Sequence, residues 1–132
     1  MQYTFRLLTK DDIPLIENLA KSVNLDEKVN YKCDFIGAFN GDSRLLGIAG
    51  VNLTKHYPQF EHIIVSKNKQ KTRLGVLLMK KIEEYIKLKK YTMYVSYILD
   101  TRKYMQNYAV KWGMFPYNYK PEGKWYSKRI GD

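Results

Sequence analysis

The chain has 132 residues, 45% of them hydrophobic, which is enough for one domain with a real core and too short for two domains of ordinary size. No apolar run approaches the roughly 18 residues that a membrane-spanning helix needs, and the N-terminus lacks the pattern of a signal peptide. The formal net charge of +10 favours polyanionic partners: nucleic acid, an anionic membrane surface or the phosphates of a cofactor. We therefore expect a single domain over residues 1–132, soluble and cytoplasmic, without a membrane partner.

Cys33 is the only cysteine, which excludes an internal disulfide. A zinc site would have to rely on His56, His62 and carboxylates. A small buried thiol is the commoner fate of a lone cysteine, so we predict a structural role for Cys33 and no metal.

The first half of the chain alternates between strand-like and helix-like patterns. Thr9 to Asp12 offer side-chain oxygens to the amides of a helix start, and apolar residues then recur at helical spacing. The predicted elements are a strand at 3–8, a helix from about Asp11, an irregular or weakly helical segment at 24–34, and strands at 35–39 and 45–53. The turn signal at 40–43 joins the last two strands into a hairpin. The segment 24–34 is a candidate flank of a substrate cleft.

The second half begins with a strand, a basic loop and an amphipathic helix. The predicted elements are a strand at 60–65, a helix from Leu74, a strand at 91–98, a helix from an Asp100 cap to Trp112 ended by Gly113, and a hairpin of 116–119 with 124–130. A helix between two strands forms a crossover connection, so the strands 60–65 and 91–98 should be parallel.

A motif lies between the strand 60–65 and its helix. The strand ends in Val65, and after four polar residues comes Gln70-Lys71-Thr72-Arg73-Leu74-Gly75. This stretch resembles the Gln/Arg-x-x-Gly-x-Gly/Ala motif of the GNAT superfamily of N-acetyltransferases, and the order of elements follows that family across nearly all of the chain. The resemblance implies an α/β (α+β) GNAT fold. Its sheet is mixed, mostly antiparallel and twisted, with six to seven strands, a central parallel pair (60–65 and 91–98) and about four helices.

The resemblance implies that this loop binds acetyl-coenzyme A, because backbone amides before a helix and the positive end of the helix dipole hold a pyrophosphate. The implied cofactor-binding residues are Ile64, Val65, Gln70, Lys71, Thr72, Arg73, Leu74, Gly75 and Val76. Arg73 departs from the motif, because it stands in the slot of the first glycine. Either Arg73 pairs with a cofactor phosphate, or its bulk narrows the groove in a protein that no longer binds the cofactor.

Catalytic candidates follow from the same resemblance. Tyr108 to Met114 is similar to the late family signature, but the usual tyrosine slot holds Ala109, so Tyr108 or Tyr104 would protonate the departing thiolate. Glu61 is the candidate general base for the attacking amine, and a solvated or ion-paired strand residue is the equally weighted alternative. Strand alternation places His62 on the opposite face from Glu61.

Three functions remain open at this point. The first is an enzyme that transfers acetyl from acetyl-coenzyme A to a primary amine of a small molecule or protein by direct attack in a ternary complex. The second is a catalytically silent assembly protein with a protein partner, located in the host cytoplasm or in the particle, since the chain also resembles a small GNAT-related virion protein of T7-like phages. Nucleic-acid binding, suggested by the charge and the interleaved tyrosines, ranks last because no recognised motif supports it.

Overall fold

The structure, a computed structural model, describes residues 3–25, 28–41 and 43–131. Asp42 of the predicted turn and residues 26–27 of the predicted irregular segment lie outside the described residues. The elements are β1 (Thr4–Leu7), η1 (Lys10–Asp12), α1 (Ile13–Ser22), β2 (Asp34–Phe39), β3 (Leu45–Asn52), β4 (Gln59–Val65), η2 (Lys67–Lys69), α2 (Leu74–Leu88), β5 (Met93–Leu99), α3 (Lys103–Lys111), β6 (Phe115–Lys120) and β7 (Gly123–Arg129). No helix in this part of the chain is long and apolar enough to cross a membrane.

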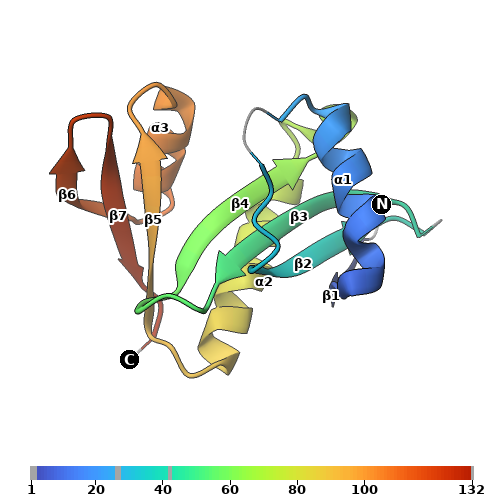
Figure 1. The fold of residues 1–132 in the computed structure, drawn as a ribbon, viewed down its shortest axis with the longest axis horizontal. Coiled ribbons are helices and arrows are strands. Elements are labelled where there is room, and N and C mark those ends of the chain that lie inside the picture. The colour runs from blue at the N-terminus through green and yellow to red at the C-terminus, as the bar shows by residue number, and fades with distance from the viewer. Residues whose placement is uncertain (1–2, 26–27, 42, 132) are drawn as a thin grey trace.

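The seven strands form one sheet in the order β1-β2-β3-β4-β5-β7-β6, with helices on both faces. Figure 1 shows α1 in front of the strands β2 to β4 and α2 behind them. The larger core lies between the sheet and α2, where Leu74, Leu78, Ile82 and Ile86 are fully buried at helical spacing. A second core lies under α1 and contains Ile16, Leu19 and Ile48.

β4 and β5 are the only parallel neighbours in the described sheet, and they barely pair. Their register contains the single pair Gln59↔Val95, whereas β3 and β4 pair over their whole length. In Figure 1 the two strands lie close together near the start of β4 and separate toward its end. The backbone edge of β4 that faces β5 is therefore left open over most of its length.

A carboxylate on α2 fastens the C-terminal strands to the rest of the molecule. One oxygen of Glu83, Oε2, accepts hydrogen bonds from Tyr94 Oη at 2.6 Å, Trp112 Nε1 at 2.6 Å and Lys128 Nζ at 2.8 Å. These three donors lie on β5, after α3 and on β7 respectively. Burial, followed by the hydrogen bond to Glu83, raises the pKa of Tyr94 well above its ordinary value.

The predicted fold class is confirmed, including the parallel pair and the two hairpins. Instead of about four helices, the described residues form three α-helices and two single-turn 3-10 helices. Asp100 does not cap α3, which begins at Lys103, because its Oδ1 accepts a hydrogen bond from the Gln106 side chain at 3.0 Å. Gly113 ends this helix as predicted, with a φ of 97° that suits glycine.

Candidate active site

The loop between β4 and α2 is held in shape by its own side chains. Gln70 Nε2 donates to the Val65 carbonyl at 3.0 Å, which ties the loop back to the end of β4. Thr72 Oγ1 donates to the Lys69 carbonyl at 2.5 Å and accepts the Leu74 N–H at 3.2 Å, so Thr72 pairs the first backbone N–H of α2. Both side chains therefore organise the loop, and its backbone is what remains available to a ligand.

The backbone at the start of α2 presents unpaired amides. The first hydrogen bond of the α2 ladder runs from the Leu77 N–H to the Arg73 carbonyl at 3.0 Å, so the amides of Gly75 and Val76 precede the ladder. A Cβ placed on Gly75 would meet only Ile63 Cδ1 at 3.9 Å, an ordinary contact. The fold itself therefore does not require glycine at position 75, and the missing side chain leaves the amides accessible from the cavity.

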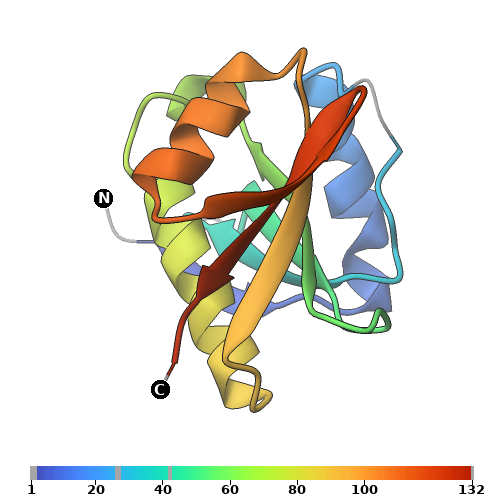
Figure 2. The same ribbon diagram turned by 90° about the vertical axis from the view of Figure 1, so that its left-hand side faces the viewer.

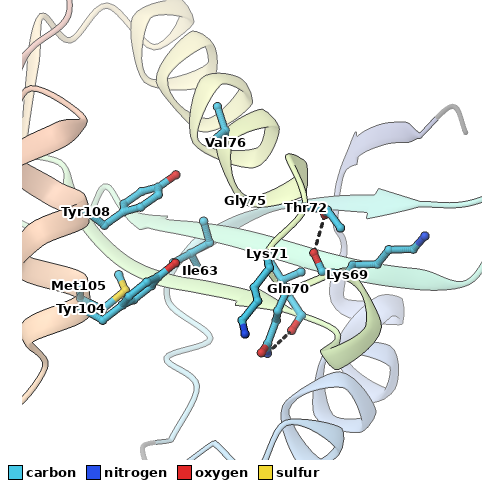
Figure 3. A pocket seen from close by; sticks show the side chains of 11 residues that line it. Ile63, Lys69, Gln70, Lys71, Thr72, Gly75, Val76, Tyr104, Met105 and Tyr108 are labelled. Atoms are coloured by element: carbon cyan, nitrogen blue, oxygen red, sulfur yellow. Dashed lines mark hydrogen bonds between the residues drawn. The ribbon is translucent and has the colours of Figure 1, made fainter.

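A cavity of about 330 Å³ lies between this loop and α3. Figure 3 shows Tyr104, Met105 and Tyr108 on the α3 side, facing Gln70, Lys71 and Gly75, with Ile63 of β4 between the two sides. The complete lining is Ile63, Val65, Lys69, Gln70, Lys71, Thr72, Gly75, Val76, Tyr104, Met105 and Tyr108. Two lysines and no carboxylate line this cavity, so its electrostatic potential favours an anion.

The open edge of β4 forms the floor of this cavity. The Ser66 N–H donates to the Leu46 carbonyl on β3 at 2.8 Å. Because N–H groups alternate along a strand and the register is regular from residue 63 to 65, the amides of Ile63 and Val65 point toward β5. No β5 residue pairs with them, since the only β4–β5 pair is at Gln59.

Tyr108 is the tyrosine that the structure places deepest in the cavity. Its hydroxyl is buried without a hydrogen-bond partner, and its ring lies nearly parallel to that of Trp112, with centroids 6.4 Å apart. Burial raises the pKa of Tyr108, so the hydroxyl keeps its proton at neutral pH. Tyr104 also lines the cavity but is 76% exposed.

Glu61 lies at a β-bulge near the middle of β4. Gly50 pairs with His62 and Val51 pairs with Phe60, so Glu61 is the extra residue between two register positions. Its Oε1 accepts a hydrogen bond from Asn30 Nδ2 at 3.0 Å, while its Oε2 is buried without a partner. A carboxylate with one hydrogen-bonded oxygen and one unpartnered oxygen is suited to accept a proton.

The prediction that Glu61 and His62 lie on opposite faces of the strand is wrong. The bulge interrupts the alternation, and the side chains of Glu61 and His62 both reach Cys33, with ligand atoms within 4.8 Å of one another. Both residues also line a second cavity of about 270 Å³. Asn30 contacts both residues, because its backbone N–H also donates to His62 Nε2 at 3.0 Å.

This second cavity adjoins the first, and Ile63 and Met105 line both. Apolar side chains of β4 and β5 form most of its walls, together with Leu25, and Arg102 contributes a cation. The two cavities thus form one cleft through the opening between β4 and β5, with the lysine-lined loop at one end and Glu61 at the other.

Cys33 lies behind Glu61 and His62, and ligand atoms of the three residues lie within 4.8 Å of one another. Glu61 and His62 are hydrogen-bonded to Asn30 in this arrangement. Burial, with the nearby carboxylates of Glu61 and Asp34, raises the pKa of Cys33 to about 12. The thiol is therefore buried and protonated.

The structure brings most of the predicted cofactor-binding residues to the cavity, but Ile64, Leu74 and Arg73 do not line it. Ile64 is 4% exposed and packs under α1. Leu74, the first residue of α2, is fully buried between that helix and the sheet. Arg73 is exposed, with a φ of −81° that any residue adopts, so it neither strains the loop nor narrows the cavity.

Among the residues that the prediction missed are Ile63, Met105 and Lys69, which line the first cavity, and Asn30, which contacts Glu61. Ile63 has a sequence signal, because strand alternation places it on the same side as Val65. Met105 has one too, because it precedes Tyr108 by three residues on a helix. Lys69 and Asn30 have none: a lysine in a basic loop and an asparagine in an irregular segment look like ordinary surface residues.

No family model matches the sequence, and no curated protein matches it. The fold, in contrast, matches solved structures over nearly the whole chain. One is the PaiA N-acetyltransferase from Thermoplasma acidophilum in complex with coenzyme A, with a TM-score of 0.81 and 14% identity, covering 98% of this chain and 100% of that chain. A second is an acetyltransferase of the GNAT family from Staphylococcus aureus Mu50, with a TM-score of 0.79 and 13% identity, covering 98% and 99%.

A third similar structure is the ribosomal-protein-S18-alanine N-acetyltransferase from Escherichia coli, with a TM-score of 0.77 and 9% identity, covering 99% of this chain and 96% of that chain. None of the three supports the narrower resemblance to a phage virion protein. At these identities the likeness establishes the fold. The protein has the fold of the GNAT N-acetyltransferases.

Proposed function

We propose that the protein transfers an acetyl group from acetyl-coenzyme A to a primary amine by direct attack within a ternary complex. The observation that carries the proposal is the cleft through the β4–β5 opening. It joins exposed backbone amides and two lysines at one end to a carboxylate with an unpartnered oxygen at the other. When bound, acetyl-coenzyme A supplies an activated acetyl thioester.

The residues present fit the acyl donor. The amides of Gly75 and Val76 and the side chains of Lys69 and Lys71 would hold the pyrophosphate at the positive end of α2. The open edge of β4 at Ile63 would hold the pantetheine arm, whose amide groups pair well with a free strand edge. Arg73 contributes at most at long range, because it lies outside the cavity lining.

Each catalytic role falls to a residue with an unpaired polar atom. Glu61 Oε2 would accept the proton of the amine, directly or through a water molecule. A backbone N–H of β4 would polarise the carbonyl oxygen of the acetyl thioester. The Tyr108 hydroxyl would give its proton to the departing sulfur of coenzyme A. Tyr108 is favoured over Tyr104 because its buried hydroxyl has no hydrogen-bond partner in the protein, whereas Tyr104 is 76% exposed.

Titration with acetyl-coenzyme A, followed by thermal unfolding, tests the donor site directly. We expect the cofactor to raise the melting temperature of the wild-type protein, and Gly75→Val, whose side chain would project into the cavity, to abolish the rise. Gly41→Val serves as the matched control, because no atom lies within 4 Å of a Cβ at that position. No rise at saturating cofactor would contradict the proposal.

Turnover is tested with a panel of amines, using mass spectrometry to detect the acetylated product. The alternative from the sequence, a catalytically silent assembly protein, predicts no product from any amine and stable association with another protein. Cofactor binding without turnover would favour that alternative.

A further inference from the structure

One face of the C-terminal strands is not covered by any helix. The side chains of Tyr94, Ile98 and Tyr126 point into the core toward α2 and α3, so the alternate residues of β5 and β7 point the other way. Figure 2 shows the β6–β7 hairpin at the front of the molecule with no element before it. We call this surface the outer face of β5-β7-β6.

Aromatic side chains gather on the outer face. The register places Tyr97 of β5 beside Trp125 of β7, with ring centroids 5.2 Å apart, and places Phe115 of β6 beside Ser127. Phe115 is 72% exposed, and Tyr117, in the irregular part of the β6–β7 pairing, is 53% exposed. These residues are far apart in the sequence, which is why their grouping is visible only in the fold.

A groove of about 230 Å³ cuts into this face beside the loop that precedes β4. The groove is lined by two tyrosines and a tryptophan, Tyr57, Tyr117 and Trp125, together with His56 and Lys55. His56 and Tyr57 meet edge to face, with centroids 4.6 Å apart, and Tyr57 is 49% exposed. No carboxylate lines the groove.

Basic residues flank the aromatic ones on the same face. Lys120 pairs with Gly123, which lies two residues before Trp125 on β7, and Arg129 lies four residues after Trp125. Because side chains alternate along a strand, those of Lys120 and Arg129 lie on the same side as Trp125. Lys124 and Lys128 lie on the opposite side, where they pair with Asp100 and Glu83. The outer face is therefore aromatic and positive.

We propose that the outer face of β5-β7-β6 binds single-stranded nucleic acid, with unstacked bases against Tyr57, Tyr117 and Trp125 and the phosphates near Lys55, Lys120 and Arg129. Aromatic side chains accept any base, and lysine and arginine track the backbone. A second copy of the chain is a poor occupant, because each copy carries a formal net charge of +10 and the two would repel each other. The inference is independent of acetyl transfer.

Fluorescence anisotropy with labelled single strands of about 15 nucleotides, DNA and RNA, tests this proposal against a duplex of the same length. We expect saturable binding at about 50 mM salt that weakens as salt rises, with single strands bound about tenfold more tightly than the duplex. Lys55→Glu should reduce the slope of log affinity against log salt by about one.

Substitutions separate stacking from charge. Tyr117→Ala and Tyr57→Ala should each weaken binding about tenfold, and Tyr117→Phe, which keeps the ring, should retain it. Tyr31→Ala is the matched control, because Tyr31 is 43% exposed but its ring contacts Phe35 of β2 and does not line the groove. The proposal is overturned by absent binding at low salt, by equal affinity for the duplex, by unchanged affinity of both alanine variants, or by a stable dimer in sedimentation.

Discussion

The two parts of the sheet on either side of the β4–β5 opening are built differently. In the N-terminal part, β1 to β4 have helices on both faces, and every residue of β3 is buried. In the C-terminal part, β5 to β7 are covered on one face only, and β6 has no buried residue. Apolar packing thus holds the first part, whereas the second is attached by core side chains on one face, such as Ile98 and Tyr126, together with the polar contacts of Glu83.

The difference explains where the cleft forms. Each part twists as its own group of antiparallel strands, and the two groups join at the single pair Gln59↔Val95. The cleft is the space between them, with Glu61 on the β4 side and Tyr108 on the α3 side. Substitutions on each side, and at the contacts that hold the parts together, test this comparison.

The largest effect is expected at Glu61, on the rigid side. Glu61→Gln should lower kcat about 100- to 1,000-fold without changing acetyl-coenzyme A affinity, because the amide keeps the shape but accepts no proton. Steady-state kinetics and cofactor titration measure the two quantities. Glu84→Gln is the control, since its side chain is 68% exposed on α2. A loss below about threefold would remove Glu61 from the mechanism.

Glu83→Ala tests how the second part is attached. Urea unfolding should show a loss of about 3 kcal/mol, because one buried donor, on Tyr94, and two partly buried donors, on Trp112 and Lys128, lose their acceptor. Amide hydrogen exchange should also accelerate more in β5 and β7 than in β3. Equal acceleration in all three strands would mean that the sheet behaves as one unit and that the comparison between its parts does not extend to their stability.

Tyr108→Phe tests the other side of the cleft and should lower kcat about tenfold, because the acid for the leaving sulfur is lost. Burial raises the pKa of Tyr108 above its ordinary value, so the protonated form persists at pH values where an exposed tyrosine ionises. The alkaline decline of wild-type activity should therefore lie above about pH 10 and disappear in the variant. A larger effect of Tyr104→Phe would transfer the role to Tyr104.

The smallest effect is expected at Asp12, which lies just before α1. Its carboxylate accepts hydrogen bonds from the Arg6 guanidinium at 2.9 Å and from the Thr9 N–H at 2.8 Å. These bonds, those from Arg6 first, lower the pKa of Asp12 to about 2. A lowered pKa stabilises the fold above the ordinary aspartate pKa near 4, and this contribution is lost as the pH falls toward 2.

Asp12→Asn should therefore cost about 1 kcal/mol at neutral pH, a value reduced by the partial exposure of Arg6. Urea unfolding at pH 7 and at pH 2 measures the difference, which should shrink at the lower pH. A cost that is the same at both pH values would mean that charge plays no part in it.

The sequence predicts the architecture well because strand and helix periodicities are local. The hydrophobic spacing of Leu74 to Ile86 and the alternation along residues 62–65 follow directly from side-chain direction. Prediction from the sequence fails where the local backbone geometry depends on pairing with a segment distant in the sequence. The bulge at Glu61 is set by the pairing with Gly50 and Val51, and no feature of the β4 sequence announces it.

The candidate site divides in the same way. Gly75 and Tyr108 are predicted from the resemblance of short local motifs to the GNAT superfamily, whereas Asn30 contacts Glu61 across 31 residues of sequence and carries no local signal. The gathering of Tyr57, Tyr117 and Trp125 likewise depends on the sheet order. A contact between segments needs the fold before it can be seen.

The buried thiol of Cys33 has a practical consequence for measurement. Because the pKa of this only cysteine is about 12, its sulfur is almost entirely uncharged at neutral pH and shielded from disulfide reagents. A colorimetric thiol reagent added to the folded protein would then report released coenzyme A with little background. The same property makes the wild-type chain a ready parent for site-specific labelling: a cysteine introduced at exposed Tyr119 would be the one reactive sulfur, without any need to remove Cys33.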